Sequence, residues 1–407
     1  MENSEKPSIL FVALNRHQRQ YFHQLGTALN TLYNVHHIYY GLSDFSGALI
    51  QPELPEVVDF TEQELADIIR FLLIKGKSRK FTGIRAWLHS QAVLKSRAYF
   101  ATRYFYHYIC HHPVDLVGVW NGINLPLACA ARVATKLEKK TLFFENGYLH
   151  NTTTVDPKGV NYQNSLVNKP RSFYDAVILE EEFLAAIYNA VPAIRGLKAK
   201  WYQSLISTPP SNTPEDIILP DKFIFLPFQV QDDTQVLLYS PRIQTMGAFV
   251  ECAVKGVKRY NLNYQDDMWI VVKEHPSDFG RVDYSTLKEE YKNDKIIFLR
   301  YYPTPELIAS SQGIITLNST VGIEALLQHK PVITLGNSFY NIDGLVRCVT
   351  QVDQLADEIP FVLAEPDHQL IDKFLYYLRY QYLAEGSWRQ PNEIHFASVA
   401  QKIRKLL

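Results

Sequence analysis

Three short stretches in the second half of the chain place polar side chains directly after an apolar strand. Residues 223–226 lead into Gln229, Gln231, Asp232 and Asp233, residues 268–273 end on Lys273 and His275, and residues 313–317 lead into Asn318, Ser319, Thr320 and Glu324. Ligands of open parallel sheets bind beyond the carboxyl ends of the strands, so we look for chemistry at these three places.

The first cluster offers two neighbouring carboxylates, Asp232 and Asp233. Such a pair can act as nucleophile or acid–base group, or it can simply form a solvated acidic turn. It lacks the Asp-x-Asp spacing often used to hold a metal. In the second cluster, Lys273 and His275 share a face if the strand stays extended, as Pro276 encourages, and together they can neutralise a phosphate. A purely structural histidine is the alternative.

The third cluster turns a strand into a helix through small hydroxyl residues. The helix start offers unpaired backbone N–H groups and a positive dipole end, which can bind an anion. Ordinary N-capping by Asn318 or Ser319 is the competing interpretation. Glu324 lies four residues after Thr320 on the same helix face, so a phosphate beside a ribose diol would use both groups.

Strands alternate with helical segments throughout, which predicts an α/β fold. We expect strands at residues 8–14, 35–40, 114–120, 140–145 and 176–179, then at 223–226, 268–273, 295–299, 313–317 and 331–335, with helices over 17–32, 125–137, 245–260, 369–383 and 393–407 and another starting at residue 320. A stretch rich in proline and small polar residues, 204–220, predicts a linker. The predicted domains are therefore residues 1–210 and 211–375, followed by C-terminal helices over 376–407 that cross back and brace both domains.

Composition describes a soluble globular chain: 407 residues, 47% hydrophobic, with a formal net charge of -1. This balance argues against a nucleic-acid binder. The polar start has no apolar signal core and no run is long enough to span a bilayer, so we expect a cytoplasmic protein. The four cysteines are scattered without CxxC spacing, which indicates neither a disulfide framework nor a zinc site.

One stretch departs from this balance, because residues 71–113 contain no Asp or Glu but eight Lys or Arg. An ordinary helix with a solvated basic face and a buried aromatic face is the interpretation we favour. Peripheral contact with an anionic membrane is the second.

The Gln-x-Gln-Asp-Asp segment at 229–233, Lys273-x-His-Pro276 and Asn318-Ser-Thr-Val-Gly-x-Glu324 together resemble the capsule-type (KpsC-like) β-Kdo transferases. More closely, the chain resembles the retaining β-Kdo transferases of the WbbB type, which terminate O-antigen chains in lipopolysaccharide biosynthesis. Kdo is a keto-sugar acid whose anomeric carbon bears a carboxylate. The resemblance covers essentially the whole chain, including residues 144–147 and 151–161.

The resemblance implies a GT-B-like architecture, two Rossmann-like domains facing a cleft, and no metal or other cofactor. CMP-β-Kdo would be the donor, bound by the second domain, and the first domain would bind an acceptor glycan ending in GlcNAc. His275, Ser319 and Thr320 would bind the phosphate, and Glu324 would bind the ribose. Gln231 is a further donor-binding candidate, and we add Lys273 from strand parity.

Retention requires two successive displacements, and a carboxylate nucleophile provides the first. The resemblance supports Asp232 in this role, with Asp233 as the alternative. Because the donor sugar is itself anionic, nearby cations must offset the repulsion; Arg242, Lys273 and Arg300 are candidates. In the first domain, Glu145 is the candidate base for the acceptor hydroxyl, or else a capping or salt-bridging carboxylate. Asn146, Asp156 and Asn161 are candidates for binding acceptor hydroxyls.

Two alternatives stay open. Another GT-B transferase, using CMP-sialic acid or a UDP-sugar, would need a similar phosphate cradle. A catalytically silent glycan-binding module would keep the fold and need no activated donor. For the transferase we expect a lipid-linked glycan acceptor at the inner face of the inner membrane, and attachment to further modules of a longer polypeptide is a further expectation.

Overall fold

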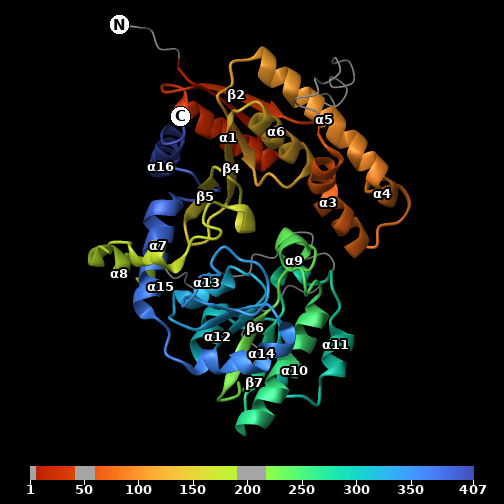
Figure 1. The fold of residues 1–407 in the computed structure, drawn as a ribbon, viewed down its shortest axis with the longest axis vertical. Coiled ribbons are helices and arrows are strands. Elements are labelled where there is room, and N and C mark those ends of the chain that lie inside the picture. The colour runs from red at the N-terminus through yellow and green to blue at the C-terminus, as the bar shows by residue number, and fades with distance from the viewer. Residues whose placement is uncertain (1–5, 42–59, 190–216) are drawn as a thin grey trace. The chain divides into compact units, whose positions relative to one another are not determined.

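The computed structural model describes residues 6–41, 60–189 and 217–407 (Figure 1). They form two compact units. The first joins Met1–Ser165 to Arg379–Leu407, and the second is the continuous segment Leu166–Leu378. Each unit contains one six-stranded sheet.

The sheet of the first unit has the order β12-β5-β4-β3-β1-β2. Its strands are β1 (Ser8–Ala13), β2 (Asn34–Tyr39), β3 (Leu116–Trp120), β4 (Lys140–Asn146), β5 (Thr152–Asp156) and β12 (Ala384–Glu385). Strands β2, β1, β3 and β4 are parallel, whereas β5 runs antiparallel to both β4 and β12. The carboxyl ends of β3 and β4 are level, because Trp120 pairs with Phe144.

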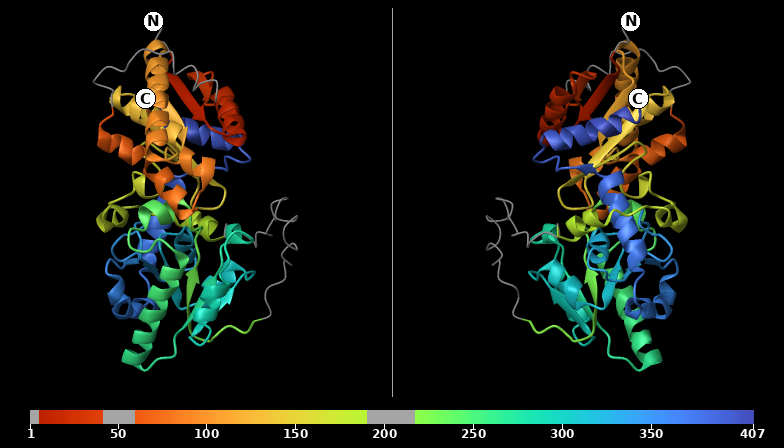
Figure 2. Two further views of the ribbon diagram at one scale, coloured as in Figure 1. Left: turned by 90° about the vertical axis from the view of Figure 1, so that its right-hand side faces the viewer. Right: turned by 90° about the vertical axis from the view of Figure 1, so that its left-hand side faces the viewer.

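Helices cover both faces of this sheet. They are α1 (Arg16–Leu29), α3 (Glu62–Ser78), α4 (Gly83–Leu88), α5 (Gln91–His111), α6 (Leu125–Lys136) and α16 (Glu393–Arg404). Helix α1 packs with α16 and α5 packs with α6, and Figure 2 shows the two pairs on opposite sides of the strands. All five residues of β3 are buried, as expected for a central strand with helices on both faces.

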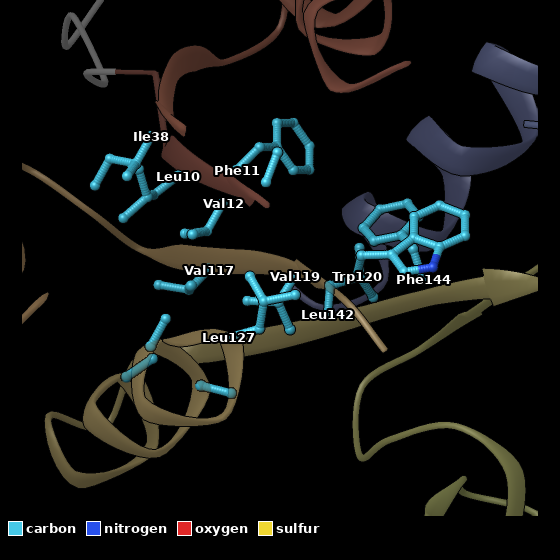
Figure 3. Close-up of a cluster of buried hydrophobic side chains, with 14 of the residues drawn as sticks. Leu10, Phe11, Val12, Ile38, Val117, Val119, Trp120, Leu127, Leu142 and Phe144 are labelled. Carbon is cyan, nitrogen blue, oxygen red and sulfur yellow. The ribbon is translucent and has the colours of Figure 1, made fainter. Parts of the chain in front are cut away.

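The core of the first unit follows the alternation of the strands. Phe11 points to one side of β1 while Leu10 and Val12 point to the other (Figure 3). Phe11 stacks on Phe22 of α1 with ring centroids 4.9 Å apart, and Phe144 of β4 meets the same ring edge-on at 5.2 Å. Aromatic packing therefore fixes α1 against β1 and β4.

The C-terminal segment completes this core. Ala384 of β12 pairs with Thr153 of β5, and the Trp388 ring lies 4.2 Å from that of Trp120. His395 of α16 is fully buried and its Nε2 shares a hydrogen bond with the Tyr21 hydroxyl at 2.9 Å. β12 and α16 therefore belong to the first unit, while the bracing of both domains by the C-terminal helices stays a prediction.

In the second unit the strand order is β11-β10-β9-β6-β7-β8, with every pairing parallel. Its strands are β6 (Phe223–Pro227), β7 (Trp269–Lys273), β8 (Ile296–Leu299), β9 (Gly313–Thr316), β10 (Val332–Thr334) and β11 (Arg347–Cys348). Counted along the chain, this is the doubly wound order 3-2-1-4-5-6. The switch point lies between β6 and β9.

The helices of the second unit are α7 (Arg171–Asp175), α8 (Glu181–Asn189), α9 (Thr234–Tyr239), α10 (Met246–Tyr264), α11 (Ser285–Glu290), α12 (Thr304–Ser310), α13 (Val321–Leu326), α14 (Leu355–Glu358) and α15 (His368–Tyr376). Helix α10 packs with α14, and α12 packs with α13. A π-helical turn, Tyr377–Tyr382, follows α15 and leads the chain back to the first unit.

The predicted α/β class is confirmed in both units. The strand predicted at 176–179 is wrong: α7 ends at Asp175 and the residues after it pair with no described strand. The apolar run there is short, and Ile178 is 83% exposed. Most of the linker predicted over 204–220 lies outside the described residues, so the domain boundary near residue 210 stays a prediction.

Candidate functional site

A buried amide network spans the switch point between β6 and β9. Gln229 Nε2 donates to Asn318 Oδ1 at 2.9 Å, and Gln229 Oε1 accepts from the Asn318 backbone N–H at 3.2 Å. Asn318 Nδ2 in turn donates to the carbonyl of Gln235 at 2.9 Å. These two side chains therefore hold the strand ends together. Their amide groups serve a structural role in the network.

Asp232 lies in the turn between β6 and α9. It is 6% exposed, and its Oδ1 accepts a hydrogen bond from Arg281 Nη2 at 2.7 Å. Asp233 has a different role, because it caps α9: its Oδ1 accepts from the backbone N–H of Thr234 at 2.5 Å and from the hydroxyl of Thr234 at 2.9 Å. Of the two carboxylates, Asp232 is buried beside a cation and Asp233 is an exposed cap.

The loop after β7 carries His275. Its Nδ1 accepts from the Ser277 backbone N–H at 3.1 Å, so the neutral ring carries its proton on Nε2 and can donate from there. Burial lowers the pKa of His275, as do Lys273 and Arg281, whereas Asp233 raises it. These interactions place the ring among the charged groups of the first and second clusters.

Lys273 ends β7 and is half-buried. Its Nζ donates to the Thr304 hydroxyl, at the start of α12, at 2.5 Å. Burial lowers the pKa of Lys273, and the carboxylate of Glu324 on α13 opposes that shift. The charges of Lys273 on β7 and Glu324 on α13 are therefore close enough to interact beyond the sheet.

The turn from β9 into α13 carries the two predicted hydroxyl residues. Ser319 Oγ accepts from the Val321 backbone N–H at 3.1 Å, and the Thr320 side chain is exposed at the N-cap. Because α13 has only 6 residues, its dipole is small. Any anion bound here would depend on hydroxyl and backbone N–H donors more than on the helix.

Besides Lys273, two cations were predicted near this site, Arg300 and Arg242. Arg300 Nε bonds to the buried carboxylate of Glu274 at 3.2 Å, and its guanidinium lies 5.2 Å from the centre of the Phe279 ring. Arg242 is exposed in the loop before α10. The cation beside Asp232 is Arg281, which the sequence analysis missed because nothing in the sequence joins a loop residue to a turn 49 positions away.

In the first unit, Glu145 and Asn146 end β4. Glu145 Oε1 accepts from the Asn146 backbone N–H at 2.8 Å, and its Oε2 accepts from Asn121 Nδ2 at 3.2 Å. Asn146 Oδ1 accepts from the indole of Trp388 at 2.9 Å. Glu145 thus lies half-buried at the carboxyl edge of β3 and β4, where amide groups of Asn121 and Asn146 donate to its carboxylate.

Asp156 and Asn161, both predicted to bind acceptor, differ in setting. Asp156 is fully buried, and it accepts from the backbone of Lys158 and Gly159, from Ser165 and from the hydroxyl of Tyr382. That geometry favours a structural role for this carboxylate. Asn161 is half-buried, with a left-handed φ of 55°.

Three further properties bear on the site. Within the residues that the structure covers, no group of three or more His, Cys, Asp and Glu side chains is arranged to hold a metal ion. All four cysteines are free thiols. None of the described helices is both long enough and apolar enough to cross a membrane.

A doubly wound parallel sheet with polar groups collected at its switch point is the arrangement by which α/β proteins bind nucleotides. Comparison with known proteins gives the biological setting. Residues 185–387, just under half of the chain, match the family of capsule polysaccharide biosynthesis proteins.

Protein FixF of Sinorhizobium fredii is 33% identical over 276 residues, which is 68% of this chain and 62% of FixF. The capsule polysaccharide modification protein LipB of Neisseria meningitidis serogroup A is 29% identical over 137 residues, 30% of each chain. The chain therefore spans less than two thirds of the length of these curated relatives. Over its second half it is similar to proteins of capsule polysaccharide biosynthesis.

Among solved structures, KpsC of Thermosulfurimonas dismutans, described as a β-Kdo 2,7 transferase, matches with a TM-score of 0.43 and 14% identity, covering 98% of this chain and 99% of that one. A UDP-GlcNAc 2-epimerase of Methanocaldococcus jannaschii matches with a TM-score of 0.33 and 14% identity, over 92% and 99% of the two chains. Likenesses this distant carry no argument about activity.

Proposed function

We propose that this chain is a retaining glycosyltransferase of the WbbB type that moves β-Kdo from CMP-β-Kdo to a sugar hydroxyl of a bacterial surface polysaccharide. The observation that carries the proposal is the convergence beyond β6, β7 and β9. A buried carboxylate, a histidine with an N–H donor, and a lysine whose charge interacts with that of Glu324 come from three neighbouring strand ends. The similarity to capsule polysaccharide biosynthesis proteins supports a glycan product.

The donor half of the site has a division of labour. The Nε2–H of His275 and the hydroxyls of Ser319 and Thr320 would hold the phosphate, because these are donors at the switch point. Glu324 would accept from the ribose hydroxyls, with Lys273 beside it, and Gln231 is a further donor contact. No step in this arrangement calls for a metal ion.

The chemistry would proceed by two displacements. An oxygen of Asp232 attacks the anomeric carbon, the bond from that carbon to the phosphate oxygen breaks, and CMP leaves with the electron pair. The acceptor hydroxyl then attacks the anomeric carbon of the adduct from the opposite side, its proton passes to a carboxylate, and the Asp232 carboxylate leaves, which restores the β configuration. Glu145 is our candidate for that base. The acceptor would be a glycan ending in GlcNAc and carried on a lipid.

An enzyme with a lipid-linked acceptor must work close to a membrane, and one exposed surface of the first unit suits that contact. Residues 77–80 and 82–88 are all exposed and include four basic residues and no acidic one. Ile84 and Trp87 of α4 are 73% and 60% exposed. We propose that this surface, the α4 surface, contacts an anionic membrane, because basic residues around exposed Trp and Ile suit the lipid–water interface. The aromatic residues of α5 are mostly half-buried or buried, as an ordinary packed helix requires.

Intact-protein mass spectrometry with CMP-Kdo generated in place tests the proposal, with Asp232→Asn alongside. We expect a Kdo-sized mass gain on the unaltered chain that maps to Asp232 and is absent from the variant. Transfer to a GlcNAc-ended acceptor without any adduct would contradict the double displacement. The absence of both adduct and transfer would contradict CMP-Kdo as the donor. Turnover of CMP-sialic acid or a UDP-sugar would then identify another transferase. Saturable CMP binding without turnover of any donor would indicate a silent module.

A further inference from the structure

The loop 275–281 after β7 is a single ordered unit that delivers Arg281 to Asp232. The Asp278 backbone N–H bonds to the His275 carbonyl at 2.9 Å, and the Asp278 carbonyl accepts from the backbone N–H of Arg281 at 2.8 Å. Gly280 makes the intervening turn with a φ of +72°. Since non-glycine residues adopt this conformation only under strain, the sequence itself favours this turn.

The guanidinium of Arg281 is placed to hold two anions. Its Nη2 bonds to Asp232 Oδ1 at 2.7 Å, and 43% of its side chain is exposed, against 7% for Asp232. A guanidinium has five N–H donors in a planar fork. Among the described residues, the structure shows no other side-chain partner for this one. With nearly half of its side chain exposed, the guanidinium keeps donors that can bind a second anion.

Behind the ion pair lies a buried carboxyl group, Asp278. It is 1% exposed, its Oδ2 accepts from the Tyr284 hydroxyl at 3.0 Å, and its Oδ1 has no hydrogen-bond partner. Burial raises the pKa of Asp278, and the nearby charges of Asp232 and Glu274 also raise it, while Tyr284 and Arg281 lower it. An ionised Asp278 would compete with Asp232 for the guanidinium, whereas a protonated one leaves Arg281 to the site.

We propose that Arg281 is a catalytic residue that bridges the Asp232 carboxylate and the carboxylate of an acidic donor sugar, and that Asp278, in the same loop, is a positioning residue. This inference rests on the proposed function. It resolves the repulsion between an anionic nucleophile and an anionic substrate, because one guanidinium holds both. It also makes Arg281 a specificity determinant for sugars with a carboxylate on the anomeric carbon.

The charge balance of the first displacement follows. Before attack, one guanidinium serves two carboxylates. When Asp232 forms its ester with the anomeric carbon and CMP departs with the bonding electrons, Asp232 loses its charge. The guanidinium then pairs with the sugar carboxylate alone. Its hold on the sugar is therefore strongest in the adduct, at the stage when CMP has left.

The test measures the rate of adduct formation by rapid-quench mass spectrometry in Arg281→Gln and Arg281→Lys. We expect Arg281→Gln to slow the adduct roughly 10- to 100-fold, the effect of one lost charged hydrogen bond. The adduct rate of Arg281→Lys should lie between those of the unaltered chain and Arg281→Gln, because lysine keeps the positive charge but loses the planar set of N–H donors. Arg347→Gln is the matched control, because Arg347 is also half-exposed and paired to a carboxylate, that of Glu358, but lies on β11, at the far edge of the sheet.

Binding of CMP alone, which has no sugar acid, shows whether each variant keeps its fold and nucleotide site, and we expect it unchanged. Asp278→Leu should slow the adduct, because it removes the acceptor of the Tyr284 hydroxyl, and Asp278→Asn, which keeps an acceptor there, should slow it less. An Arg281→Gln protein that forms adduct at the unaltered rate overturns the bridging role. If the unaltered chain forms neither adduct nor product from CMP-Kdo, the proposed function itself fails and this inference fails with it.

Discussion

Gln229 and Asn318 lie 89 positions apart in the chain, yet their side-chain amides bond to each other across the switch point at 2.9 Å. Both residues are buried, at 6% and 1% exposed. Each amide also bonds to backbone groups, so the pair acts as a clasp between the ends of β6 and β9. The clasp fixes the separation of the Asp232 turn from the Ser319–Thr320 turn.

Removing this clasp should destabilise the second unit. We expect Gln229→Leu to lower the free energy of unfolding by roughly 1–3 kcal/mol, because it leaves buried polar groups of Asn318 without partners. Urea unfolding followed by circular dichroism measures the change. Gln231→Leu is the control, since Gln231 is half-exposed in the turn after β6, and should shift stability by less than about 0.5 kcal/mol. Equal effects of the two substitutions would show that the amide bonds are not the cause.

The half-buried His275 predicts a pH dependence of nucleotide affinity. Its pKa lies below the ordinary 6.5, so the ring is neutral at neutral pH, and a bound phosphate raises the pKa by stabilising the imidazolium. Affinity should therefore rise as pH falls, until the unliganded ring is itself protonated. Titration calorimetry with the methyl ester of CMP avoids the titration of the free phosphate. His275→Gln should flatten the profile, and an unchanged slope in that variant would remove His275 from the phosphate site.

Substitutions should distinguish the structural role of Asp156 from the proposed acceptor-binding role of Asn161. Asp156→Ala removes an acceptor for backbone, hydroxyl and tyrosine donors, so we expect it to lower the stability of the first unit by roughly 2–4 kcal/mol in calorimetry. Asn161→Gly, which tolerates the left-handed φ of this position, should leave stability nearly unchanged and raise the KM for acceptor. If Asp156→Ala kept full stability, the structural role given to this carboxylate would be wrong.

The α4 surface predicts binding to anionic vesicles. Flotation with phosphatidylglycerol vesicles should recover the unaltered chain, and phosphatidylcholine vesicles should recover much less, because basic residues add an electrostatic attraction. An Ile84→Ser and Trp87→Ser double variant should lose most of the binding. Leu262→Ser is the control, since Leu262 is 81% exposed on α10. Equal flotation of the control and the double variant would argue for non-specific adhesion.

Much of the fold could be predicted because apolar runs such as Phe223–Leu226 are bounded by turn residues, and these boundaries recur between helical patterns. Strand β5 was missed although its Thr-Thr-Thr-Val run has β-branched residues throughout, a usable signal. The opposite error, the strand at 176–179, came from an apolar run with too few residues to be buried.

The site was less predictable, because its side chains are set by contacts distant in sequence. The burial of Asp156 depends on the Tyr382 hydroxyl, 226 positions away. Arg281 reaches Asp232 through a loop whose shape depends on Gly280 and on backbone bonds that no spacing rule records. The position of Asp232 after β6 was visible in the sequence, but its cation was not.

The discontinuity of the first unit has a consequence for biosynthesis. Ala384, Trp388, Val399 and Ile403 belong to its buried core, yet a ribosome makes them after the whole of the second unit. Residues 166–378 can therefore form their complete sheet as they emerge. During that time the core of the first 165 residues lacks its C-terminal part, and some of its apolar surface stays uncovered. A nascent chain would thus expose this surface until residues 384–403 have emerged, which gives a chaperone time to bind it.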